Sequence, residues 1–185
     1  MILDLDRRRG WPPELRTWLE RFPRETWREQ RSASAQFWLD VHDGFRREIA
    51  DVRTLVDDYR AARKGARELG LTGTPRIRML VAHLHGHHGI EDIHYFPAFR
   101  AIDARLAPGI DALAGDHRLL VGRIETLAGA GEALLAALAR DAAGTGSAAR
   151  HAADALAAAA DAFTALLLKH FDDEEDLVIP LMIGR

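Results

Sequence analysis

The chain has 185 residues, of which 48% are hydrophobic and 29% charged, and these values are typical of one globular domain. Its net charge of −3 does not indicate binding to nucleic acid, and its lack of cysteine excludes disulfides, zinc–thiolate sites, iron–sulfur clusters and cysteine nucleophiles. No long apolar run predicts a transmembrane helix, and no apolar segment near the start predicts a secretory signal. We therefore expect a cytoplasmic protein that does not bind membranes.

Residues 1–31 form a segment that precedes the first long helical pattern and is rich in aromatic side chains. Trp11, Trp18 and Trp27 all lie in it. Because large aromatic side chains contribute much of the energy of a core, we expect an N-terminal arm with one short helix that packs on the rest of the chain. Binding of this arm to a protein partner is the alternative. The arginine run 7–9 is expected to be solvated.

Residues 32–185 contain long segments in which apolar side chains recur with the three- and four-residue spacing of an α-helix. The segments cover about 34–63, 76–104, 110–140 and 148–176. Pro97 is expected to kink or end the second segment, and Pro180 to end the fourth. Helices joined by short connections predict an all-α fold, with an up-down-up-down four-helix bundle over 32–185.

A histidine followed four residues later by a glutamate occurs twice in the chain. The two pairs are His87 with Glu91 and His170 with Glu174, and each is followed by a proline ten residues after its histidine. Residues four apart lie on one face of a helix. Each pair therefore presents an imidazole and a carboxylate in the same direction, and such donors suit metal ions that take nitrogen and oxygen ligands.

A single histidine precedes each pair, His42 before the first and His117 before the second. Each lies on the apolar face of its predicted helix. Burying so many titratable groups without partners would be costly, and a shared metal centre removes that cost. The candidate metal ligands are His42, His87, Glu91, His117, His170 and Glu174.

These residues resemble the motifs of the hemerythrin family, also called HHE cation-binding domains. The resemblance covers about 34–181 and includes Phe45 after His42, the run Tyr95-Phe96-Pro97, Asp116 before His117, and Ile179-Pro180. It implies a four-helix bundle around two iron ions (Fe2+/Fe3+) joined by an oxo or hydroxo group. The histidines among the six candidates would be terminal ligands, and Glu91 and Glu174 would be bridging carboxylates.

The third helix departs from the pattern of the oxygen-carrying hemerythrins. Those proteins have a second histidine four residues after the first, where this chain has Val121. The site would be open at that position, or another residue would complete it. The candidates are His83, His88 and His94: His83 and His94 share the predicted inward face with His87 and Glu91, and His88 is adjacent to His87. For all three, exposure to solvent or a role in orienting the ligands is favoured over ligation.

The other charged residues near the two pairs are expected to lie outside the site. Within the acidic run 172–176, only Glu174 is predicted to point inward, because it has the same spacing as Glu91. Asp92 and Glu175 are expected beside the site. His85 and His151 are predicted to be surface residues.

The resemblance implies a protein that reacts with O2, hydrogen peroxide or nitric oxide at an open iron position. Consumption of peroxide or nitric oxide is the favoured function, which would make the chain a di-iron oxidoreductase. The alternative is a non-catalytic protein that binds, senses or stores O2 or iron. The expected partner is a small molecule, and the sequence identifies no protein partner.

Overall fold

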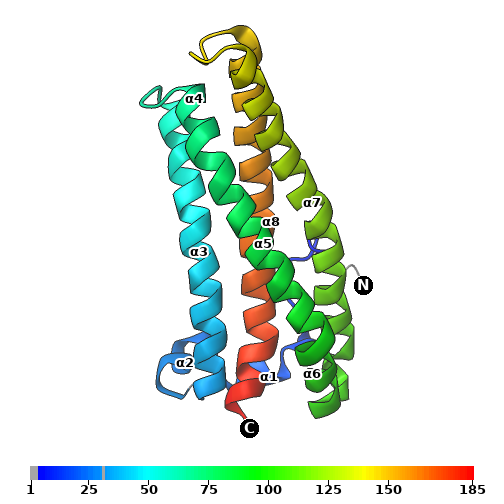
Figure 1. The fold of residues 1–185 in the computed structure, drawn as a ribbon. Helices are drawn as coiled ribbons and strands as arrows, with labels where there is room; N and C mark the ends of the chain where they lie inside the picture. Colours follow the sequence, from blue (N-terminus) through cyan, green and yellow to red (C-terminus); the bar gives the residue numbers. More distant parts are fainter. Residues whose placement is uncertain (1–3, 31) are drawn as a thin grey trace. The chain divides into compact units, whose positions relative to one another are not determined.

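The computed structural model describes residues 4–30 and 32–185, and within them all regular secondary structure is helical (Figure 1). The all-α prediction is therefore confirmed. The elements are a 3-10 turn (Pro13–Leu15), α1 (Thr17–Arg21), α2 (Arg24–Gln30), α3 (Ala33–Arg60), α4 (Ala66–Glu68), a π-helical turn (Leu69–Gly73), α5 (Thr74–Ile90), a second π-helical turn (Glu91–Tyr95), α6 (Phe96–Ile102), a 3-10 turn (Ala104–Leu106), α7 (Ala107–Arg140) and α8 (Ser147–Ile183).

Two compact units make up the chain. The first unit comprises Met1–Gly44, His87–Leu119 and Leu166–Arg185, and the second comprises Phe45–Gly86 and Leu120–Ala165. All six predicted metal ligands belong to the first unit. The boundary after residue 31 and the antiparallel order of a four-helix bundle stay predictions.

The N-terminal arm lies in the first unit and buries part of its aromatic surface there. Trp11, Leu15 and Trp27 belong to a hydrophobic cluster that also contains Trp38 of α3 and Leu177 of α8. The arm has two short α-helices where one was expected, because Pro23 separates them. Phe22, the residue before this proline, has φ −129° and ψ 75°. These angles lie outside the helical region, as the steric effect of a following proline predicts.

Helix α3 begins where Ser32 caps it and buries a face with helical spacing. The Ser32 hydroxyl accepts a hydrogen bond from the backbone N–H of Ala35 at 3.2 Å, which satisfies one of the free amides of the first turn. Ala35, Trp38 and His42 follow at steps of three and four and are all buried. This spacing places the His42 imidazole in the interior of the first unit.

The second predicted helix is interrupted by a π-helical turn just before Pro97. The backbone N–H of Phe96 donates to the carbonyl of Glu91, five residues earlier. Pro97 has no N–H, and its ring crowds the carbonyl four residues before it. The wider turn accommodates both effects, so the helix continues as α6 beyond the position where we expected it to kink or end.

The predicted buried face of this helix was wrong at His83 and His94. Both of these histidines are exposed, while His88 and Glu91 are buried. The π-helical turn adds one residue to the turn that follows Glu91. The next buried residue is therefore Phe96, five positions after Glu91, while Tyr95, four positions after it, is only half-buried. A strict four-residue count along the sequence could not anticipate this shift.

Helix α8 also differs from its prediction, because it continues through Pro180 to Ile183. By length and composition alone, α8 is long and apolar enough to cross a membrane, which inspection of the sequence for long apolar runs did not anticipate. Buried helices of globular proteins meet the same criteria. In α8, the final turns carry the buried charged residues His170 and Glu174.

Candidate metal centre

The structure brings the six predicted ligands together in the first unit and adds His88 to them. His42 comes from α3, His117 from α7, and the pair His170 and Glu174 from α8. His87 and His88 end α5, and Glu91 opens the π-helical turn. Three sets of donor atoms, each within 4.8 Å of one another, could hold a metal ion: His42, His87 and Glu91; His88, His117 and His170; and Glu91, His117 and Glu174.

Two groups of histidines can be distinguished. The first group is His42 and His87, whose ring centroids lie 5.3 Å apart. The second group is His88, His117 and His170. In it the rings of His88 and His117 stack with centroids 4.0 Å apart, and the Nε2 atoms of His117 and His170 are separated by 3.2 Å.

Glu91 lies between the two histidine groups. Its Oε1 is 3.1 Å from Nε2 of His87, in the first group, and its Oε2 is 3.5 Å from Nε2 of His117, in the second. Two oxygens of one carboxylate that each face a different set of imidazoles can bridge two metal ions.

Glu174 has the same relationship to the two groups. Its Oε1 is 3.4 Å from Nε2 of His42, and its Oε2 is 3.3 Å from Nε2 of His170. The indole N–H of Trp38 also donates to Oε1 at 2.7 Å, which fixes the orientation of this carboxylate. Each of the two glutamates therefore contacts one histidine of each group.

Further carboxylates contact the opposite edge of three imidazoles. Nδ1 of His42 lies 2.9 Å from Glu175, and Nδ1 of His117 lies 3.0 Å from Asp92. Histidines that bind metals usually donate their other ring N–H to a carboxylate or carbonyl, which fixes the tautomer. These contacts leave the Nε2 atoms directed at the cluster.

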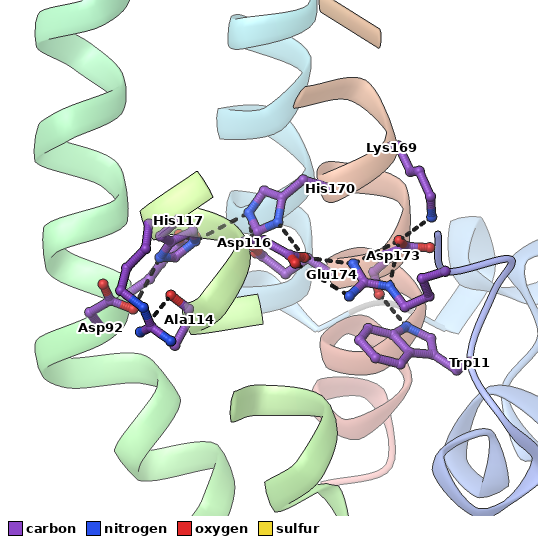
Figure 2. Close-up of polar contacts among 12 residues, drawn as sticks. Trp11, Asp92, Ala114, Asp116, His117, Lys169, His170, Asp173 and Glu174 are labelled. Carbon is purple, nitrogen blue, oxygen red and sulfur yellow. Dashed lines mark hydrogen bonds and ion pairs between the residues drawn. The ribbon is translucent and has the colours of Figure 1, made fainter. Parts of the chain in front are cut away.

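The third such contact joins His170 to α7. Nδ1 of His170 lies 3.3 Å from Oδ2 of Asp116, as Figure 2 shows together with the Asp92 contact of His117. Asp116 is itself buried, with 2% of its surface exposed.

Burial and neighbouring charges shift the pKa values of the histidines in opposite directions. Burial lowers the pKa of His87 to about 4 and that of His117 to about 3, so both are neutral at pH 7. Burial also lowers the pKa of His170, but its close contacts with the carboxylates of Asp116 and Glu174 outweigh burial and raise the value to about 9. Burial also lowers the pKa of His42, but its contacts with the charged carboxylates of Glu174 and Glu175 together outweigh burial and raise the pKa.

The two central glutamates respond differently to their surroundings. Burial, together with the nearby charge of Glu174, raises the pKa of Glu91 well above its ordinary value. Glu174 is also buried, but the charges of His42 and His170 lower its pKa. Perturbed titratable groups gathered in one place are typical of a functional site.

Several polar atoms at the centre of this cluster form no hydrogen bond. They are Nε2 of His42, Nε2 of His88, both carboxylate oxygens of Glu91 and Oε2 of Glu174. A buried polar atom without a partner costs free energy. Since all these atoms belong to the donor sets of the two histidine groups, the residues fit a pair of bound cations, which would satisfy them together.

Sequence reasoning missed several charged residues around the centre. Arg8 was expected in solvent but has only 2% of its surface exposed. Asp173 and Glu175 are also buried, so the prediction that only Glu174 of the acidic run points inward was wrong. Arg8 contacts carboxylates more than a hundred residues away, and no local pattern could reveal these pairs.

The remaining expectations concern residues at the edge of the site. Asp92 and Glu175 lie beside it, each against the Nδ1 edge of a histidine, as predicted. His85 and His151 are exposed, also as predicted. His83 belongs to the second unit, where its Nδ1 pairs with Glu48 at 2.9 Å.

The fold and the site thus define the class of protein: an all-α protein whose buried histidines and glutamates could hold a metal. A family model described as the hemerythrin HHE cation binding domain matches residues 33–133, which is more than half of the chain. The chain belongs to this family, as the resemblance indicated. No curated protein and no solved structure matches the chain.

The family match ends within α7 and does not reach α8. The structure connects α8 to the matched region, because it places His170 and Glu174 against His42 of α3, His88 of α5 and His117 of α7.

Proposed function

We propose that the protein holds two iron ions, bridged by Glu91 and Glu174 and by an oxo or hydroxo group, in an up-down-up-down four-helix bundle. Membership of a cation-binding family supports metal binding. The observation that carries the two-metal proposal is that each glutamate contacts one histidine of each group. Such an iron pair supplies electrons for the chemistry of O2, hydrogen peroxide or nitric oxide.

His88 is the residue that we propose in place of the histidine missing at Val121. Its Nε2 is buried without a hydrogen bond, and it belongs to a donor set with His117 and His170. His83 and His94 are exposed and are not proposed as ligands. With His88 included, one metal has three histidines and the other has only His42 and His87.

The metal with fewer histidines would have the open coordination position. The side chain of His87 is 12% exposed, whereas those of His42, His170 and Glu174 are fully buried. A ligand would therefore approach from the His87 side. Since the rest of the cluster is closed, the site favours ligands the size of O2, peroxide or nitric oxide.

Consumption of peroxide or nitric oxide is the activity that we propose, which would make the protein an oxidoreductase located in the cytoplasm. The low pKa values of His87 and His117, about 4 and 3, keep both imidazoles unprotonated at neutral pH. Trp38 holds the Glu174 carboxylate in place. The chain's own residues thus bind and orient the metals, and burial excludes bulk water.

Reversible binding of O2 without turnover is a second candidate function. His88 favours it, because His88 would restore the number of histidines that the oxygen-carrying hemerythrins have. The second candidate requires a stable adduct, and the first requires turnover.

Addition of hydrogen peroxide or nitric oxide to iron-reconstituted protein distinguishes these functions. Catalytic loss of either compound, with oxygen evolution in the case of peroxide, is the expected result. Glu91→Gln should lack this activity, and His85→Gln, a change of an exposed histidine, should retain it. A stable O2 adduct without turnover would select the second candidate, and iron-loaded protein inert to all three compounds would contradict both.

A further inference from the structure

Arg8 of the N-terminal arm lies within the first unit, beside the residues that support the metal centre. Its guanidinium Nη2 donates to Oδ2 of Asp116 at 2.6 Å and lies 2.8 Å from Oδ2 of Asp173. Its Nε donates to the same oxygen of Asp173 at 2.9 Å. The Arg8 side chain is 1% exposed. A charge buried to this extent is rarely found unless it is paired and hydrogen-bonded.

The carboxylate that Arg8 holds is the one behind His170. Oδ2 of Asp116 accepts a hydrogen bond from Arg8. The same oxygen lies 3.3 Å from Nδ1 of His170, and Figure 2 shows Asp116 and His170 facing each other. Nη1 of Arg8 is 3.4 Å from the other oxygen of Asp116, so the guanidinium faces the carboxylate with two nitrogens. Such paired contacts fix the orientation of the carboxylate as well as its charge. The orientation of Asp116 in turn determines the orientation of the His170 ring.

Trp11 and Lys169 keep the Arg8 contact in place. The guanidinium carbon of Arg8 lies 4.4 Å from the centroid of the Trp11 ring, within the range of a cation–π interaction. The Trp11 indole N–H donates to the backbone carbonyl of Asp173 at 2.6 Å (Figure 2). Lys169 donates to the Asp173 carboxylate from one turn earlier on α8, also at 2.6 Å.

A second arginine of the arm, Arg24, contacts the carboxylate behind a histidine of the other group. Nη1 of Arg24 is 3.5 Å from Oε2 of Glu175, whose Oε1 is 2.9 Å from Nδ1 of His42. The Arg24 side chain is 41% exposed, so solvent screens its charge. The arm therefore contacts a carboxylate behind each histidine group, and of these two arginines Arg8 does so from a buried position.

We propose that Arg8 is a positioning residue of the metal centre, acting through Asp116 on His170. The proposal rests on the proposed two-metal function. Through Asp116, Arg8 would aim Nε2 of His170 at the ion shared with His88 and His117. The N-terminal arm is thereby part of the metal site.

Co2+ titration of the full-length protein tests this proposal. Wild type is expected to bind two ions, and Arg8→Gln to bind one of them about 10- to 100-fold more weakly, which is the usual effect of losing a residue that orients a ligand. The other ion should bind as in wild type. Arg7→Gln is the matched control, because it removes the same charge from the neighbouring, exposed position.

A second readout separates positioning from a general loss of stability. In the Co2+ protein, the proton on Nδ1 of His170 gives a paramagnetically shifted NMR signal that exchanges with water. Arg8→Gln should accelerate this exchange, and Arg7→Gln should not. Equal exchange in Arg8→Gln and wild type would overturn the proposal.

Arg8→Lys keeps the proposal testable if Arg8→Gln does not fold, since lysine retains the charge but lacks the planar fork of donors. One weakened ion of the two is again expected. Wild-type affinity for both ions in a folded Arg8 variant would overturn the positioning role alone. Wild-type protein that binds fewer than two ions would instead contradict the proposed function.

Discussion

Nε2 of His117 and Nε2 of His170 lie 3.2 Å apart in the buried interior, while Nδ1 of each contacts its own carboxylate, Asp92 or Asp116. The pKa of His170 is raised to about 9 and that of His117 is lowered to about 3, so at pH 7 the Nε2–H of His170 donates to the neutral Nε2 of His117. In the proposed metal centre, a cation bound to both nitrogens would take the place of this proton. Asp92 and Asp116 would hold the two rings in position for it.

Replacing a bridging carboxylate should remove more metal than replacing a surface histidine. Glu91 contacts His87 of one group and His117 of the other, so Glu91→Ala is expected to lower bound iron well below two per chain. His85→Ala should leave the iron content unchanged, because His85 is exposed. Metal analysis of the purified variants measures both. Equal iron loss in the two variants would show that the assigned buried face is wrong.

His88 should be required for full metal loading, and His94 should not. His88→Gln removes a buried Nε2 of the donor set with His117 and His170, so one of the two metal ions should be lost or strongly weakened. His94→Gln changes an exposed side chain three residues beyond Glu91 and should bind metal like wild type. Isothermal titration with ferrous iron under anaerobic conditions measures the difference. Two ions bound by His88→Gln at wild-type affinity would refute the assignment.

Trp38 should stabilise the site through its indole N–H. Trp38→Phe keeps an aromatic ring, which packs edge-on against Tyr95 at 4.8 Å between centroids, but loses the hydrogen bond to Glu174. A hydrogen bond to a charged group is worth about 1.5–3 kcal/mol, so the free energy of unfolding of the metal-free protein should fall by about that amount. Urea denaturation measures it, and iron affinity should fall as well.

Trp18→Phe is the matched control for this change. Its indole N–H also donates to a carboxylate, that of Asp103, at 2.8 Å, but neither residue belongs to the metal cluster. Iron affinity should therefore be unaffected. If both tryptophan variants bound iron with wild-type affinity, the proposed role of Trp38 in holding Glu174 would be incorrect.

Acidification should destabilise the metal-free protein between about pH 6.5 and pH 4. His87 and His117, with pKa values lowered to about 4 and 3, stay neutral in the fold but are protonated in the unfolded chain below about pH 6.5. The unfolded state then binds more protons than the folded state, so the free energy of unfolding decreases as the pH is lowered. The raised pKa of Glu91 has the opposite effect, because the folded state takes up this proton first and gains stability as the pH is lowered. The raised pKa values of His42 and His170 stabilise the fold to their full extent once the unfolded chain is also protonated, so these two histidines add little slope well below pH 6.5.

Urea denaturation of the metal-free protein at pH 7 and pH 5 tests this dependence. The protein should be less stable at pH 5, and His87→Gln should show a smaller difference between the two conditions. A metal-free protein that is equally stable at both values would mean that the buried histidines do not control its acid sensitivity.

Helical periodicity was sufficient to predict the secondary structure and the inward direction of most ligands. His42 lies on the same face as Ala35 and Trp38, and the four-residue spacing of His170 and Glu174 places both in the interior. These features depend on local geometry, which the sequence specifies directly. The contacts of Glu174 with His42 and of His170 with His117 agree with the convergence that the repeated pair led us to expect.

Other features depend on contacts that no local pattern specifies. The π-helical turn at Glu91–Tyr95 changes which residues of the second long helix are buried, and it excludes His94 from the interior. Arg8 is one of three consecutive arginines, and only its distant partners Asp116 and Asp173 distinguish it from Arg7.

Anaerobic reconstitution with ferrous iron, followed by metal analysis and an ultraviolet–visible spectrum after exposure to air, tests the central claim most directly. The arrangement of Glu91 and Glu174 predicts about two irons per chain and near-ultraviolet absorption typical of an oxo-bridged pair. Protein that binds no iron, or one iron without this absorption, would contradict a carboxylate-bridged metal pair between the two histidine groups.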